Sequence, residues 1–177
     1  MKLLLLVLFI TLSFGNNLEI QYANGIKAFE EKNYAEAFKI WEPLAKEGFH
    51  ITQHNLGHMY ENGLGVKKDY KKAFEWYEKA ANQNFFRSQY NLGLMYLNGI
   101  GIKENHKKAK ELFEKAANQG HPAAQNNLGV MYESGQGGLK INKITAYNYY
   151  MMAAKQGHLV AQDNLDILCK QSSWACK

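Results

Sequence analysis

Hydrophobic and polar positions recur along this chain with a period of about 36 residues. Asn55 returns as Asn91, Asn127 and Asn164, at intervals of 36, 36 and 37 residues. The apolar and glycine positions around each asparagine return with it. Because a single unit of this length cannot bury its apolar face alone, the period predicts units that stack against one another.

Each repeat contains two helical stripes. In the first, a leucine, a glycine and a tyrosine at positions i, i+1 and i+4 share one helix face, which predicts helix A. In the second, alanines and aromatic residues at helical spacing predict helix B. Paired glycines between the stripes predict a turn with positive φ angles that ends helix A. In the first full repeat these residues are Leu56, Gly57, Tyr60, Gly63, Gly65, Ala73, Trp76, Tyr77, Ala80 and Ala81.

The run over residues 56–66, which reads LGHMYENGLGV, together with later Gly-His pairs resembles the Sel1-like repeat. The resemblance covers residues 22–177 and implies a right-handed α/α solenoid of antiparallel helix pairs, related to tetratricopeptide repeats. The expected fold class is therefore an all-α solenoid of Sel1-like helical hairpins. Two departures from the family pattern are an extra residue in the loop over 135–140 and Asp166 in place of the helix A glycine.

The expected organisation begins with a signal peptide. Lys2 precedes an apolar run of about ten residues, and Ser13 and Gly15 are small residues typical of a cleavage site. A retained membrane anchor is the alternative, but a bilayer span needs about 20 apolar residues. We therefore expect a secreted or periplasmic protein that has no membrane contact after cleavage.

The remaining segments follow the repeat period. We expect a signal peptide over 1–15, a tetratricopeptide-like capping hairpin over 16–50, Sel1-like repeats over 51–86, 87–122 and 123–159, and a C-terminal half-repeat cap over 160–177.

Some helix A positions vary between repeats although they share one helix face. The family resemblance implies that helix A lines the concave side of the solenoid. We predict a groove there with an apolar centre that binds a protein or peptide partner. The alternative is that the varying positions are simply exposed. The predicted contact residues are His54, His58, Glu61, Tyr90, Leu94, Leu97, Asn126, Val130 and Glu133.

The two cysteines of the chain, Cys169 and Cys176, lie close together in sequence. On one continuous helix their Cα atoms would be about 10 Å apart, which is too far for a disulfide, so the chain must turn between them. Since secretion delivers the chain to an oxidising compartment, we predict that they are joined. Trp174 is expected to fold back as a lid over the exposed apolar end.

Other binding chemistry has little support in the residues. The formal net charge is +5, but a single arginine, Arg87, does not favour a nucleic-acid surface. His50, His54 and His58 lack a further fixed ligand, and His50 aligns with positions that precede helix A. We therefore expect no metal site, no cofactor and no nucleic acid, and a monomeric chain.

An enzymatic function is the alternative to a scaffold. The signal, repeat and cysteine pair are similar to those of secreted, cysteine-rich Sel1-like proteins of Helicobacter, a resemblance that implies penicillin binding and weak β-lactamase activity. This chain departs from them, because it has one cysteine pair where they carry a pair in most repeats. No serine recurs with the period or heads an SxxK sequence. The main prediction is a non-enzymatic scaffold with no catalytic residues.

Overall fold

The computed structural model describes residues 17–176. These residues form two compact units, the first ending at Lys79 and the second beginning at Ala80. The predicted signal peptide over residues 1–15 lies outside the described residues.

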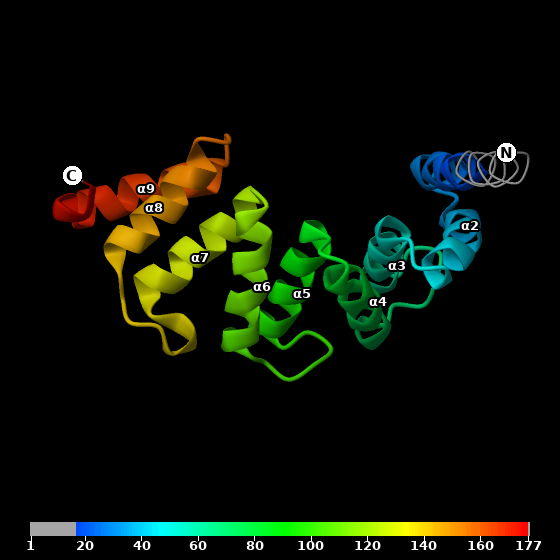
Figure 1. Cartoon of the computed structure of the whole chain (residues 1–177), viewed down its shortest axis with the longest axis horizontal. Coiled ribbons are helices and arrows are strands. Elements are labelled where there is room, and N and C mark those ends of the chain that lie inside the picture. The colour runs from blue at the N-terminus through cyan, green and yellow to red at the C-terminus, as the bar shows by residue number, and fades with distance from the viewer. Residues whose placement is uncertain (1–16, 177) are drawn as a thin grey trace, which may run out of the picture. The chain divides into compact units, whose positions relative to one another are not determined.

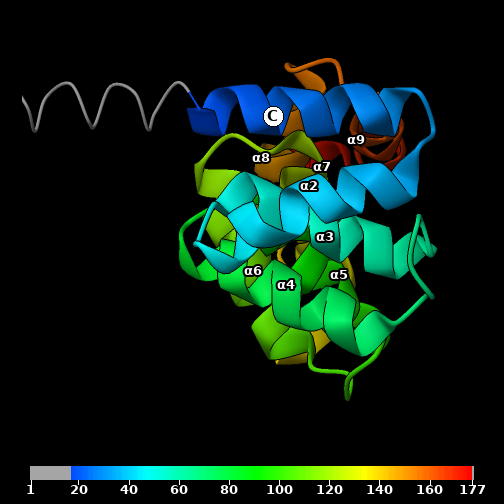
Figure 2. The ribbon, with the colours of Figure 1, turned by 90° about the vertical axis from the view of Figure 1, so that its right-hand side faces the viewer.

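The first unit is a succession of short helices joined by tight turns (Figure 1). A helix over residues 17–30 lies beside α2, Tyr34–Lys46, as Figure 2 shows. α3, His50–Asn62, is the helix A that follows, and α4, Tyr70–Asn82, is its helix B.

The second unit continues the alternation of helix A and helix B. Regular structure is helical throughout the described residues, in successive hairpins, so the predicted fold class, an all-α solenoid of helical hairpins, is confirmed. The elements are α5 (Phe86–Asn98), α6 (His106–Asn118), α7 (Pro122–Ser134), η1 (Gln136–Gly138), α8 (Lys143–Ala154), α9 (Leu159–Gln171) and η2 (Ser173–Cys176).

Local chemistry fixes where each helix starts and stops. Helix B begins at a capping side chain, because Asp69 Oδ1 accepts the N–H of Lys72 at 3.1 Å. Helix A ends at a left-handed glycine, Gly63, whose φ is 72° and whose N–H donates to the Met59 carbonyl. The later repeats use the same two devices, with caps at Asn105 and Asn142 and left-handed glycines at Gly99 and Gly135.

A glycine of the first helix in each hairpin lies directly against an aromatic ring of the second. A Cβ atom built on any of these glycines would lie between 2.1 and 2.6 Å from the nearest ring atom, a distance that no real Cβ tolerates. Glycine therefore allows the two helices to approach closely enough to bury the ring. The pairs are Gly25 with Trp41, Gly57 with Tyr77, Gly93 with Phe113, and Gly129 with Tyr150.

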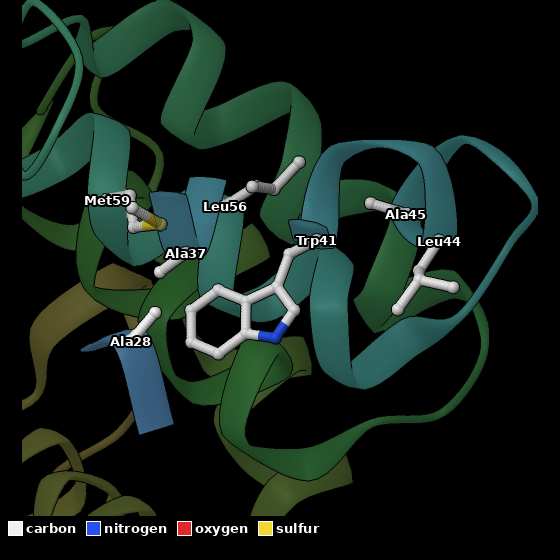
Figure 3. Close-up of a cluster of buried hydrophobic side chains, with 7 residues drawn as sticks. All are labelled: Ala28, Ala37, Trp41, Leu44, Ala45, Leu56 and Met59. Carbon is white, nitrogen blue, oxygen red and sulfur yellow. The ribbon is translucent and has the colours of Figure 1, made fainter. Parts of the chain in front are cut away.

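The core follows the fixed columns of the repeat. Leu56, Leu92 and Leu128 are 0%, 4% and 0% exposed, so the predicted leucine column of helix A faces the interior. Figure 3 shows the indole of Trp41 extending from α2 toward Ala28, with Leu56 close by in the same cluster. The ring that each glycine admits is thus a central part of the core.

The C-terminal segment contains the predicted disulfide. Cys169 and Cys176 are joined, with their Cα atoms 5.7 Å apart. α9 ends at Gln171, and the chain turns through η2 to bring the two cysteines together. The predicted turn between the cysteines is confirmed.

The prediction that Trp174 forms a lid over this end is wrong. Trp174 is 62% exposed, whereas Ser172 and Ala175 are buried at 3% and 6%. The Lys143 ammonium group donates to Ser172 Oγ at 2.7 Å and ties the turn to the start of α8. The tight turn therefore places the small side chains inside and leaves the indole in solvent.

The glycine–ring contact makes a direct prediction for stability. We expect Gly129→Ala to lower the free energy of unfolding by about 1–3 kcal/mol, because the new methyl group overpacks the Tyr150 ring. This loss opposes the gain of about 1 kcal/mol that alanine brings to a helix interior. Urea denaturation of the purified chain measures the change.

Asp166 supplies a matched control. It occupies the glycine column in α9, but no helix B ring packs on it within residues 17–176. Asp166→Ala should change stability by no more than about 0.5 kcal/mol. Equal losses for the two variants would contradict the steric account.

Candidate functional site

The predicted contact residues lie on α3, α5 and α7, and we refer to these nine side chains as the helix A stripe. Most of them are half-buried, including Leu94 and Leu97. Val130 is exposed at 36%, whereas Asn126 is 7% exposed. The amide oxygen of Asn126 accepts a hydrogen bond from Asn164 Nδ2 at 3.0 Å. Asn126 therefore braces α7 against α9 and offers little surface to a partner.

In the first unit, the stripe touches the aromatic residues of neighbouring helices. Glu61 Oε2 accepts the hydroxyl of Tyr77 at 2.7 Å. The ring of His54 lies 5.4 Å from that of Tyr77, centroid to centroid. His58 faces the ring of Phe29 at 6.2 Å. These three stripe residues form a mixed imidazole, carboxylate and aromatic surface.

In the second unit, the stripe is largely apolar. The ring of Tyr90 stacks on that of His121 with centroids 4.5 Å apart, and it contacts Phe113 at 5.9 Å. Burial raises the pKa of the Tyr90 phenol, and a hydrogen bond with Asn127 opposes this shift. Leu94 packs partly against the Phe113 cluster. Its remaining surface is available for contact with a partner.

The stripe and the buried ring change together from one repeat to the next. The Tyr150 hydroxyl donates to Glu133 Oε2 at 2.7 Å, as the Tyr77 hydroxyl does to Glu61. In the repeat between them the buried ring is Phe113, which has no hydroxyl, and the position equivalent to the glutamate is Leu97. Burial and the Glu133 carboxylate raise the pKa of the Tyr150 phenol, so the hydroxyl remains a donor. Sequence reasoning missed this pairing, although glutamate with tyrosine and leucine with phenylalanine can be read in the repeat alignment.

A second missed feature is a column of glutamines at the start of helix A. Gln125 Nε2 donates to the Ala117 carbonyl at 3.2 Å, and Gln53 Nε2 donates to the Ala45 carbonyl at 3.0 Å. These buried amides satisfy carbonyls at the end of the preceding helix B. Gln156 adds a link within the hairpin, because its amide, just after the end of α8, donates to Gln125 Oε1 at the start of α7 at 2.8 Å. The recurrence of glutamine every 36 residues could have revealed this column from the sequence.

The histidines of the Gly-His pairs have a structural role. His121 Nδ1 accepts the N–H of Ala124 at 3.2 Å, and His158 Nδ1 accepts that of Ala161 at 3.1 Å. Each imidazole therefore caps a helix A through its unprotonated nitrogen. Burial, followed by the positive charges of Arg87 and His158, lowers the pKa of His121. Among residues 17–176, no group of three or more His, Cys, Asp or Glu side chains is arranged to hold a metal ion.

The repeated hairpins agree with a comparison against known protein families. The Sel1 repeat family matches residues 22–49, 50–85, 87–121 and 122–158. The chain belongs to the Sel1 repeat family.

Solved Sel1 repeat structures have the same architecture. A Sel1 repeat protein from Oxalobacter formigenes is 32% identical, with a TM-score of 0.80, over 85% of this chain and 62% of that one. A protective antigen of uropathogenic Escherichia coli with an SLR fold is 27% identical, with a TM-score of 0.83, over 90% of this chain and 35% of that one. This Sel1 repeat chain thus spans less than two thirds of either protein.

Sel1 repeats are generally non-enzymatic scaffolds for protein–protein interaction, and this chain has that scaffold. No protein of curated function matches the chain. Within the described residues, no helix of this Sel1 repeat chain has both the length and the apolar character needed to cross a bilayer.

A double-mutant cycle can test whether the stripe residue and the buried ring of one repeat are energetically coupled. Glu133→Leu with Tyr150→Phe reproduces the Leu97 and Phe113 combination of the preceding repeat. Each single change leaves one member of a part-buried hydrogen bond without its partner, and we expect each to cost about 1–3 kcal/mol in stability. The double variant should recover about 1–2 kcal/mol relative to the sum of the singles.

A control pair comes from the same helices. Tyr147 is a half-buried tyrosine of α8 outside the ring column. Tyr147→Phe combined with Glu133→Leu should be additive in urea denaturation. If the Tyr150 pair were equally additive, the two columns would not be coupled.

Proposed function

We propose that this Sel1 repeat chain is a secreted or periplasmic scaffold that binds a protein or peptide through its helix A stripe. The fixed columns already account for the interior, since the leucines and the helix B rings are buried. Most of the stripe residues lie at the edge of that interior and keep part of their surface exposed, and they vary in chemistry from repeat to repeat. This combination of a fixed core and a varying face supports a recognition surface.

The apolar part of the stripe in the second unit is the observation that carries the proposal. Val130, an exposed valine on α7, and the half-buried Leu94 and Leu97 on α5 come from successive helices A. Tyr90 adds a ring that is stacked and therefore held in position. Pre-ordered aromatic and aliphatic side chains of this kind favour the helix-in-groove or extended-peptide mode of binding.

The disulfide supports the proposed location. Bridges of this kind form and persist in oxidising compartments, and Cys169 and Cys176 are joined here. A short loop closed by a disulfide stabilises its fold by about 2–3 kcal/mol. In the oxidising compartment that we propose, the bridge would persist and keep the C-terminal end of α9 in place.

Two charges placed in the apolar stripe test the function. Leu94→Asp with Val130→Asp should weaken binding of a partner captured by cross-linking from the native envelope fraction by at least about tenfold, because the carboxylates would be desolvated on binding. The affinity of the captured partner for each purified variant is the measurement. Wild-type affinity in the double variant would contradict the proposal.

An apolar residue on another face provides the control. Ile144 lies on α8, a helix B, and is 54% exposed. Ile144→Asp introduces the same charge and should leave partner affinity unchanged. Circular dichroism confirms that each variant remains folded.

A further inference from the structure

A small pocket opens beside the stripe residues of the first unit. Its volume is about 250 Å³. Pockets for whole drug-sized ligands are about 300–1,000 Å³, so this one suits a single side chain better than a complete small molecule. The pocket is lined by Ile26, Phe29, Trp41, His54, Asn55 and His58.

The wall of the pocket is aromatic. The rings of Phe29 and Trp41 lie 5.6 Å apart with an interplanar angle of 31°, and the imidazole of His58 lies 6.2 Å from Phe29. The indole N–H of Trp41 donates to the carbonyl of Tyr22 at 3.3 Å. Trp41 is therefore committed as a donor, and only 2% of this lining residue is exposed. A wall of this kind favours an aromatic guest in an offset or edge-on arrangement.

The lining of the pocket includes a side-chain amide with hydrogen-bonding capacity. Asn55 belongs to the asparagine column that repeats along the chain. In the second unit, Asn164 donates to Asn126 at 3.0 Å and Asn127 bonds to Tyr90. Asn55 has no such bond to any residue in 17–176, and it is half-buried at the pocket. Its donor and acceptor groups match those of a peptide unit.

We propose that this pocket is the anchor site for the peptide partner, in which an aromatic side chain of the peptide packs against the wall formed by Phe29, Trp41 and His58 while Asn55 hydrogen-bonds the main chain beside it. This inference rests on the proposed function and specifies the chemistry of the partner. No carboxylate lines the pocket, so a lysine or arginine side chain would lose its hydration without gaining a counter-charge. Lysine and arginine are also absent from the lining, so the permanently charged partners of a carboxylate guest are absent from it.

Peptide selection on the oxidised chain tests the anchor. A random library of 12-residue peptides displayed on phage should yield binders that share an aromatic residue at one position. Replacing that residue by alanine in a synthetic peptide should weaken binding more than tenfold, measured by fluorescence anisotropy. Asn55→Ala in the protein should weaken binding about three- to tenfold, the effect of losing one hydrogen bond.

Two further variants make the test specific. His58→Trp should abolish binding, because the larger ring would occupy the pocket. Asn118→Ala removes an exposed asparagine of α6 and should leave binding unchanged. Thermal melts followed by circular dichroism establish that all three variants fold.

The outcomes separate this inference from the proposed function. Peptides whose affinity falls with Leu94→Asp and Val130→Asp but not with Asn55→Ala or His58→Trp would overturn the anchor and leave the proposed function standing. Peptides insensitive to every variant, or a selection that enriches no peptide, would overturn both. Selected peptides without a shared aromatic residue would overturn the anchor alone.

Discussion

The contact between a helix A glycine and a helix B ring determines how each hairpin packs. A Cβ atom on Gly57, Gly93 or Gly129 would lie within 2.6 Å of a ring atom, so the close approach of the two helices depends on its absence. The ring is fully buried in each case, and the neighbouring leucine is buried with it. Once this contact is set, the orientation of helix A is set as well, because the side chains of a rigid helix rotate together.

That orientation decides which helix A positions remain outside. The residue one turn after the glycine is half-buried at the edge of the interior, which we call the rim position, and in two repeats it accepts a hydrogen bond from the buried ring. The rim position is glutamate when the ring is a tyrosine, and leucine when the ring is Phe113. The surface is therefore polar where the buried ring is a tyrosine and apolar where it is a phenylalanine, while the glycine and leucine columns stay the same, which allows one scaffold to present different recognition surfaces.

Much of the fold could be predicted from the sequence because its determinants are local and periodic. The leucine column, the left-handed glycines such as Gly63 and the disulfide turn all follow from short patterns. The burial of Asn126 could not be predicted in this way, since its partner Asn164 comes from the next repeat. The outward position of Trp174 depends on the conformation of a short turn, which no periodic pattern specifies. The pocket beside Asn55 combines side chains from separate helices, so only coordinates reveal it.

The most direct test of this account measures whether the glycine and the ring are coupled. Gly93→Ala is compared in the wild-type chain and in a Phe113→Leu background by urea denaturation. The account predicts a loss of about 1–3 kcal/mol in the wild-type chain and little or no loss when the ring is absent, because a leucine leaves room for the methyl group. Equal losses in both backgrounds would contradict the claim that the glycine exists to admit the ring.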